Sequence, residues 1–421
     1  MQKLLRFIFT RKINSGDRGG GRTDGHGRAR TGTTDMNITP HLHSMPTGLH
    51  NITQRNLLCR HSRVMLSVLV LTNGAVQPAP SERVILSEYA HAKCLDGSPA
   101  VYYISRGSNR FAFLFHLQGG GWCQTLDECA SRAKTALGSS LSYPATMDLS
   151  AIDAPPTAGT GGGHDAFDRN ATANPLFAKW NYVYVPYCDG ASFSGDNSSI
   201  SPALQFRGKA IREAVVASLR AEEGLSKATH AVVWGCSAGG AATYFHTDWF
   251  AAQLPAAMTR GMPDSGWFVE GDYARDGKPH YGARMANMYT MVNAASSLPA
   301  SCVTAQGDRC LFAPNVVPHL TTPLFAINSK FDASMAPGSY DDGTSYNCSE
   351  YYHLFSPAGE CDAGSVNAFG DYVTAKMKAA LKPPHGAYVD SCYRHCGQTT
   401  DQISGHGSGP PFATCGVQAL V

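Results

Sequence analysis

The sequence contains no apolar run of about eighteen residues, so no transmembrane helix is expected. It also has no Cys-x-x-Cys motif matched to a second such motif or to a His-x-x-x-His motif, which argues against a structural zinc site. Charged residues are only 16% of the 421 residues, and the formal net charge is +2. Most of the basic excess lies in residues 1–64, so the main body carries no surplus that favours nucleic-acid binding.

The amino-terminal part differs in composition from the rest of the chain. Residues 1–64 are basic, with little apolar periodicity, and are expected to be disordered. Residues 65–81 resemble a signal peptide, with a basic flank, a short apolar centre and small residues after it. Two explanations of this segment's position stay open. Translation starts at Met65, or residues 1–64 are a genuine tail with or without a targeting role. Residues 82–421 have no internal linker or repeat and are expected to form one domain.

The cysteines favour an oxidising compartment. Twelve of the 13 lie between Cys94 and Cys415, and several are close pairs. Disulfides explain this pattern better than metal ligation and predict secretion. The close pairs are Cys123/Cys129, Cys302/Cys310, Cys348/Cys361 and Cys392/Cys396. Five N-glycosylation sequons are compatible with secretion: Asn37, Asn51, Asn170, Asn197 and Asn347.

Short apolar runs and a helical pattern alternate after residue 82. Apolar residues make up 43% of the chain, enough for a large core. The segment 206–223 has apolar residues four apart, as in a helix with one buried face. Strand, helix and strand in succession predict βαβ units and an α/β fold with a mostly parallel central sheet. The runs that read as strands buried on both faces are Arg110–Leu117, Asn181–Val185, Ala231–Trp234 and Pro323–Ile327.

A Gly-x-Ser-x-Gly motif carries the chemistry. Gly235-Cys236-Ser237-Ala238-Gly239 follows a β-branched run and precedes a helical pattern. This is the context of a nucleophile elbow, in which small neighbours leave room for a strained serine turn. The alternative is a glycine-rich turn that only packs a helix on the sheet. The strand–turn–helix setting favours Ser237 as a nucleophile.

A second glycine-rich segment follows the run 110–117. Gly119, Gly120 and Gly121 resemble an oxyanion loop, in which backbone amides face developing negative charge. Phosphate binding is the alternative, but the segment has neither GxGxxG nor GxxxxGK[ST] spacing. Trp122 is either a pocket residue or an ordinary core residue.

A serine nucleophile needs a base and an orienting carboxylate. In this kind of fold the chain order is serine, acid, histidine, and each follows a strand. Asp332 follows the run 323–327, and His395 follows a short strand candidate at Gly386–Asp390. The alternatives left open are Asp341, Asp342 and Asp362 for the acid, and His353, His385 and His406 for the base.

Together these segments resemble the pectin acetylesterase/Notum family of α/β-hydrolase-like serine esterases. The order and spacing cover about residues 85–417 and look closer to the plant pectin acetylesterases than to animal Notum. The matching segments are LQGGGWC (117–123), PYCDGASFSGD (186–196), FRGKAIREAV (206–215), GCSAGG (235–240), DSGWF (264–268), TPLFAINSKFD (322–332) and DSCYRHC (390–396).

The resemblance implies an α/β-hydrolase-like three-layer sandwich that needs no cofactor or metal. It also implies disulfides Cys123–Cys129 and Cys94–Cys188. This chain departs from the family at Gln118, where Glu is usual, and after Asp332, where Trp-Gln is frequent. The roles implied are catalysis for Ser237, Asp332 and His395, and an oxyanion hole for Gly120, Gly121 and Ala238. The residues expected to line a substrate pocket are Trp122, Asp189 and Ser192.

Three functions are consistent with these residues. The first is a secreted, cell-wall esterase that removes acetyl groups from pectin-like polysaccharide. The second is a Notum-like carboxylesterase that removes a fatty acyl group from a protein or lipid. The third is an inactive carbohydrate-binding protein, which the intact set of serine, acid and histidine disfavours. The expected partner is an ester substrate, with no nucleic acid, and the chain is expected to be a monomer.

Overall fold

The computed structural model describes residues 77–152, 165–197, 199–201, 203–270, 281–332, 334, 363–391, 395–396 and 417–420. The predicted disordered region 1–64 and the signal-like segment up to residue 76 lie outside these residues. A single sheet organises the part that is described.

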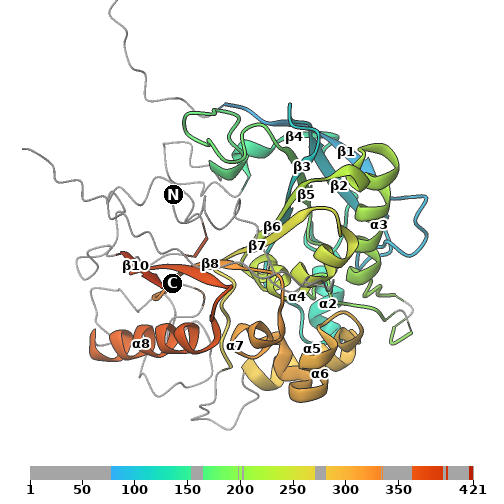
Figure 1. Ribbon diagram of the computed structural model, residues 1–421. Coiled ribbons are helices and arrows are strands. Elements are labelled where there is room, and N and C mark those ends of the chain that lie inside the picture. Colours follow the sequence, from blue (N-terminus) through green and yellow to red (C-terminus); the bar gives the residue numbers. More distant parts are fainter. Residues whose placement is uncertain are drawn as a thin grey trace, which may run out of the picture. The chain divides into compact units, whose positions relative to one another are not determined.

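This sheet has 10 strands in the order β10-β9-β8-β7-β6-β3-β5-β2-β1-β4 (Figure 1). The strands are β1 Pro80–Ile85, β2 Val101–Ser105, β3 Ala112–Leu117, β4 Thr146–Asp148, β5 Asn181–Val185, β6 His230–Cys236, β7 Met258–Asp264, β8 Phe325–Ser329, β9 Gly386–Asp390 and β10 Val417–Leu420. From β5 through β3, β6, β7 and β8 to β9, neighbouring strands run parallel. The remaining pairs are antiparallel.

The apolar runs in the sequence located β3, β5, β6 and β8, but none of them marked β7, whose sequence MTRGMPD is not continuously apolar. Asn181–Val185 and Gly386–Asp390 are strands with the expected bounds, and the other runs overlap β3, β6 and β8. Strands β3 and β5 are buried at every position, because both faces of a central parallel strand are covered. The predicted α/β-hydrolase-like fold class is therefore confirmed.

The helices pack mainly on one face of the sheet. They are α2 Leu126–Arg132, α3 Gly208–Glu222, α4 Ala238–Gln253, α5 Tyr281–Met291, α6 Ala300–Gln306, α7 Ala313–Val316 and α8 Ala363–Ala380. Helix α3 matches the helix expected within 206–223. It buries Ile211, Val215 and Leu219 in one apolar cluster with Phe113 and Phe115 of β3. Figure 1 shows α8 beside the β8–β10 end of the sheet.

The opposite face of the sheet is covered differently. Leu114 of β3 and Trp234 of β6 pack there against Phe167 and Trp180, which belong to a segment of 3₁₀ turns and loops. Among the described residues, no α-helix contributes to this cluster. Alternation along each strand sends neighbouring side chains to opposite faces, so both layers are built from the same strands.

Four disulfides join the described residues: Cys94–Cys188, Cys123–Cys129, Cys302–Cys310 and Cys236–Cys396. The first two confirm the pairs implied by the family resemblance, and the third was one of the close pairs. The close spacing of Cys392 and Cys396 did not indicate the partner of Cys396. Cys396 instead bonds to Cys236, 160 residues away, because the fold brings the ends of distant strands together. Cys348, Cys361 and Cys392 lie outside the described residues.

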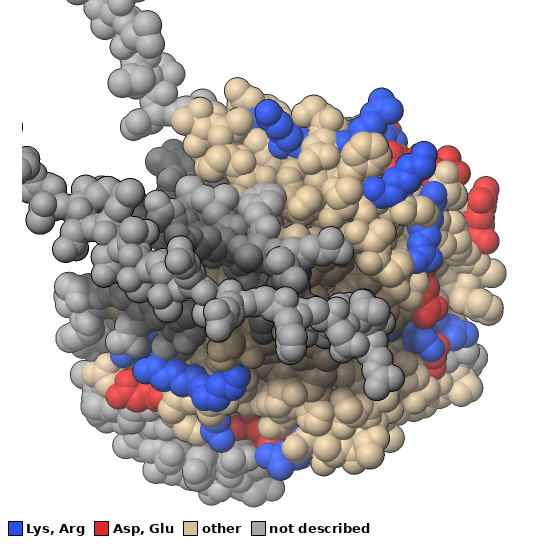
Figure 2. Space-filling model, viewed as in Figure 1, with Lys and Arg blue, Asp and Glu red and all other residues tan. Residues whose placement is uncertain are grey.

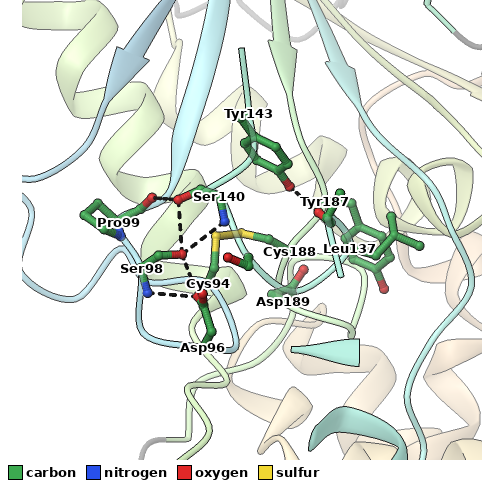
Figure 3. The surroundings of a disulfide bond; sticks show 12 residues. Cys94, Asp96, Ser98, Pro99, Leu137, Ser140, Tyr143, Tyr187, Cys188 and Asp189 are labelled. Atoms are coloured by element: carbon green, nitrogen blue, oxygen red, sulfur yellow. Dashed lines mark hydrogen bonds between the residues drawn. A yellow bond between two sulfur atoms is a disulfide. The ribbon is translucent and has the colours of Figure 1, made fainter. Parts of the chain in front are cut away.

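The Cys94–Cys188 disulfide anchors the loop that follows β5. Beside it, Ser98 Oγ donates to Asp96 Oδ1 over 2.5 Å, and Ser140 Oγ donates to the Pro99 carbonyl oxygen over 2.6 Å (Figure 3). The Leu95 amide donates to the Cys188 carbonyl oxygen. The segment after β5 is therefore fixed to the loop between β1 and β2.

The surface of the described part mixes charges of both signs. Figure 2 shows Lys and Arg side chains interspersed with Asp and Glu on the face in view. Across the described residues, none of the helices is long and apolar enough to cross a membrane.

Candidate active site

Ser237 occupies the sharp turn between β6 and α4. Its φ is 60° and its ψ is −127°, a conformation that is strained for a residue with a side chain. Its amide donates to the Asp264 carbonyl oxygen over 3.1 Å, and its hydroxyl does not cap α4. Ser237 is partly exposed although both its neighbours are buried. The turn therefore presents the hydroxyl of Ser237 to the surface at the amino end of a 16-residue helix.

The glycine-rich segment after β3 lies directly against this turn. A Cβ atom at Gly119 would lie 2.2 Å from the Cys236 carbonyl oxygen and 3.0 Å from Ser237 Cβ. A Cβ at Gly239 would lie 1.9 Å from the Leu117 carbonyl oxygen. Only glycine fits at these contacts. They bring the backbone at Gly119 against the Ser237 turn, at the start of the segment whose amides could face an oxyanion.

Replacement of Gly119 by alanine is expected to separate the glycine-rich segment from the Ser237 turn. The new methyl group would overlap the Cys236 carbonyl, and relief requires a backbone shift that costs about 1–3 kcal/mol or more. Both the esterase activity and the melting temperature of the variant should be lower than those of the wild type. Gly224→Ala is the comparison, because nothing lies within 4 Å of its Cβ position and only its φ of 68° is unfavourable. Equal activities of the two variants would contradict this prediction.

Asp332 and His395 meet on the same edge of the sheet. Asp332 follows β8 and His395 follows β9, and the two strands are parallel neighbours. His395 Nδ1 and Asp332 Oδ1 are 2.7 Å apart. The Asp332 side chain is fully buried, whereas 19% of the His395 side chain is exposed. The carboxylate is therefore positioned to hold the ring with Nδ1 protonated and Nε2 free to act as a base.

Two opposing effects determine the pKa of His395. Burial by itself lowers the pKa of the imidazole, since the charged form loses hydration. The negative charge of Asp332 and its hydrogen bond to the ring act in the other direction, with a further contribution from Asp264. The carboxylates prevail, and the pKa of His395 lies above its ordinary value of 6.5. An imidazole of raised pKa accepts a proton from a hydroxyl more readily.

The other acid and base candidates are not brought to this place among the described residues. His385 lies before β9, at the opposite edge of the parallel sheet, and its Nδ1 accepts from the Leu324 amide over 3.3 Å. Burial lowers the pKa of His385. Asp341, Asp342, Asp362, His353 and His406 lie outside the described residues.

Two predicted pocket residues lie beneath the turn. Ser192 is fully buried; its Oγ donates to the Ala238 carbonyl oxygen over 2.7 Å and accepts from Trp122 Nε1 over 2.8 Å. Asp189 is also fully buried, accepts from the Phe193 amide, and lies against the first residue of α3, Gly208. Burial raises the pKa of Asp189 to about 6. Ser192 therefore supports the turn, whereas Asp189 fixes the loop after β5 against the start of α3. Direct contact of either residue with substrate stays a prediction.

Trp122 belongs to a row of aromatic side chains that leads toward His395, and its contact with substrate stays a prediction. Its ring is partly buried and meets the ring of Phe268 edge-on, with centroids 4.8 Å apart. Phe268 in turn contacts the ring of His395 at 6.5 Å. An aromatic wall therefore extends from the glycine-rich segment to the histidine.

The unusual Gln118 keeps a backbone contact. Its Oε1 accepts a hydrogen bond from the Tyr187 amide over 2.8 Å. A carboxylate oxygen could accept the same bond, so the exchange of Glu for Gln preserves this link between the segments after β3 and β5.

The sequence analysis missed Asp264 and Ser265 as members of the site. Ser265 Oγ donates to Asp264 Oδ1 over 3.1 Å and accepts from the Cys396 amide over 2.9 Å. Asp264 is the last residue of β7 and Ser265 follows it, and β7 lies between the strands that precede Ser237 and Asp332. Their position in DSGWF, one of the segments that carry the family resemblance, was a usable signal, because the ends of parallel strands share one edge of the sheet.

One group of residues has the spacing of a metal site. A ring nitrogen of His395 and the sulfur atoms of Cys236 and Cys396 lie within 4.8 Å of one another. The two sulfur atoms are bonded to each other, and a disulfide provides no thiolate ligand. The group therefore reports how close His395 lies to the residue before Ser237.

Comparison with known proteins identifies the family. The pectinacetylesterase family profile matches residues 77–408. Pectin acetylesterase 7 of Arabidopsis thaliana is 34% identical over 355 residues, which cover 80% of this chain and 84% of the relative. Pectin acetylesterase 11 of the same plant is 32% identical over 351 residues, covering 80% and 83%.

Human NOTUM, a palmitoleoyl-protein carboxylesterase, is 32% identical over 257 residues, which cover 57% of this chain and 48% of that protein. The plant relatives thus match over a larger share of the chain, as the motifs predicted. The chain belongs to the pectinacetylesterase family and is an esterase.

Proposed function

We propose that this protein hydrolyses esters through Ser237, His395 and Asp332, and that its substrate is O-acetylated pectin-like polysaccharide. The observation that carries the proposal is the strained, partly exposed Ser237 turn on the same sheet edge as the Asp332–His395 hydrogen bond of 2.7 Å. A nucleophile on an elbow and a carboxylate-oriented imidazole are the parts that acyl transfer needs.

The reaction begins when His395 accepts the Ser237 proton and the serine oxygen attacks the ester carbonyl. Asp332 stabilises the resulting imidazolium, and amides of Gly120, Gly121 and Ala238 bind the oxyanion. Each oxyanion donor contributes about 3 kcal/mol. The alcohol departs with the proton from His395, and water then releases the acid from the acyl-enzyme. Ser192 joins the turn to the segment that carries the glycines, through Ala238 and Trp122.

The names of the plant relatives favour acetyl groups on pectin as the substrate, since they match over most of the chain. The aromatic wall of Trp122 and Phe268 beside His395 favours a second candidate, a longer acyl chain, as the name of the NOTUM relative also suggests. We further propose a monomer with one esterase domain over residues 82–421, secreted to the cell wall. The four disulfides support an oxidising compartment.

Hydrolysis of p-nitrophenyl acetate, butyrate and palmitate separates the two candidates. We expect kcat/KM to be highest for acetate, and purified protein to release acetate from acetylated pectin. A preference for palmitate would transfer the assignment to a fatty acyl esterase. Folded protein that cleaves none of these esters would contradict the proposed function and leave a carbohydrate-binding role.

A further inference from the structure

His395 has to cross the sheet edge to reach Ser237. Its loop follows β9, whereas Ser237 follows β6, and β8 and β7 lie between them. Neighbouring strands are spaced about 4.8 Å apart, so the two strand ends are separated by about 14 Å. The side chain of His395 is too short to cover this distance. The backbone at residues 395–396 must therefore itself be held above β7.

Three contacts hold this loop, one at the end of each of the strands β8, β7 and β6. His395 Nδ1 binds Asp332 Oδ1 after β8, over 2.7 Å. The Cys396 amide donates to Ser265 Oγ after β7, over 2.9 Å. The Cys396 sulfur is bonded to Cys236, the last residue of β6 and the neighbour of Ser237. The residue after the base is thus covalently joined to the residue before the nucleophile.

Ser265 is itself fixed on both sides. Its amide donates to the Ile327 carbonyl oxygen of β8 over 2.9 Å, and its φ of 45° is unusual for a residue with a side chain. The carbonyl oxygen of the preceding residue, Asp264, accepts the Ser237 amide. A single turn after β7 therefore contacts the nucleophile segment, the acid-bearing strand and the base-bearing loop.

We propose that the Cys236–Cys396 disulfide, together with Ser265, positions His395 at Ser237, so that hydrolysis depends on this disulfide and not on the disulfide Cys302–Cys310. The inference rests on the proposed function, in which His395 is the base. Cys236, Cys396 and Ser265 are positioning residues: they touch no substrate and act through the place of the imidazole. A displacement of about 1 Å in a reacting group lowers rates by about 100-fold.

The disulfide gives the activity a defined chemical sensitivity. The Cys396 residue is partly exposed, whereas Cys236 is 3% exposed, so an external dithiol attacks the Cys396 sulfur. The thiolate of the dithiol forms a mixed disulfide with Cys396 and releases Cys236 as a thiolate, which takes up a proton. The second thiol of the reagent then closes on the first sulfur and releases Cys396. Two electrons pass from the dithiol, which becomes a cyclic disulfide.

The test compares Cys236→Ala/Cys396→Ala with Cys302→Ala/Cys310→Ala in the full chain, using p-nitrophenyl acetate. Cys302 and Cys310 lie in the apolar cluster of α5–α7, eight residues apart in sequence, and neither lies at the end of a strand that carries a catalytic residue. The first variant is expected to lose kcat by about 100-fold with KM changed by less than about threefold. The second should keep the kcat of the wild type at a temperature where both are folded.

Further measurements test the proposal even if the Cys236→Ala/Cys396→Ala variant does not fold. Dithiothreitol should abolish the activity of both the wild type and the Cys302→Ala/Cys310→Ala variant, and reoxidation should restore it. Ser265→Ala should lower kcat with little change in KM. A peptide containing Cys236 joined to Cys396 should appear in a non-reduced digest.

The inference is overturned if that peptide is missing, if fully reduced enzyme keeps its kcat, or if both double variants lose kcat equally. An inactive wild type would instead overturn the proposed function.

Discussion

Ser237→Ala is expected to lower kcat for p-nitrophenyl acetate by about 10⁴- to 10⁶-fold, the largest effect of any single substitution in this chain. The alanine fits the turn, because it lacks only the hydroxyl, and the amide of residue 237 still reaches the Asp264 carbonyl oxygen. Since the hydroxyl does not cap α4, its loss should leave the melting temperature within a few degrees. Steady-state kinetics and a thermal melt measure the two quantities.

The matched control for this substitution is Ser131→Ala, on the exposed side of α2. Its kcat should equal that of the wild type. If Ser237→Ala retained more than about a tenth of the wild-type kcat, the nucleophile would be another group and the proposed mechanism would be wrong.

Asp332→Asn is expected to lower kcat by about 10⁴-fold at neutral pH. An amide can offer its NH₂ group to Nδ1 of His395, which favours the wrong tautomer of the ring and leaves no free Nε2 lone pair facing the hydroxyl. It also removes the negative charge that stabilises the imidazolium. The side chain is fully buried, so an isosteric amide is preferable to alanine, which would add a cavity. The measurement is kcat against pH, with the fold checked by circular dichroism.

The pH profile gives the same residue a second, independent test. In the wild type, kcat/KM should rise with pH and level off above the pKa of His395, which lies above 6.5, because only the neutral ring accepts a proton. Without the carboxylate of Asp332, burial lowers the pKa of the ring, so the inflection should move to lower pH in Asp332→Asn. An unchanged inflection would show that the group titrating in the wild type is not His395.

Several features of this protein could be predicted from local sequence. An apolar run located β5 with the right bounds, since strands buried on both faces need apolar residues at nearly every position. The short strand expected before His395 is β9, Gly386–Asp390. Gly235 and Gly239 marked the turn at Ser237, because close packing there excludes a Cβ atom. The order of serine, acid and histidine selected Asp332 as a candidate. All of these signals lie within a few residues of the feature that they predict.

Other features depended on which strands become neighbours, and only the tertiary structure decided them. His395 rather than His385 meets Asp332, because residues after parallel strands gather at one edge of the sheet and residues before them at the other. The partner of Cys396 is 160 residues away and not the nearby Cys392, and Ser265 enters the site because β7 lies between β6 and β8. Strand order arises from packing across the whole sheet, and no local pattern records it.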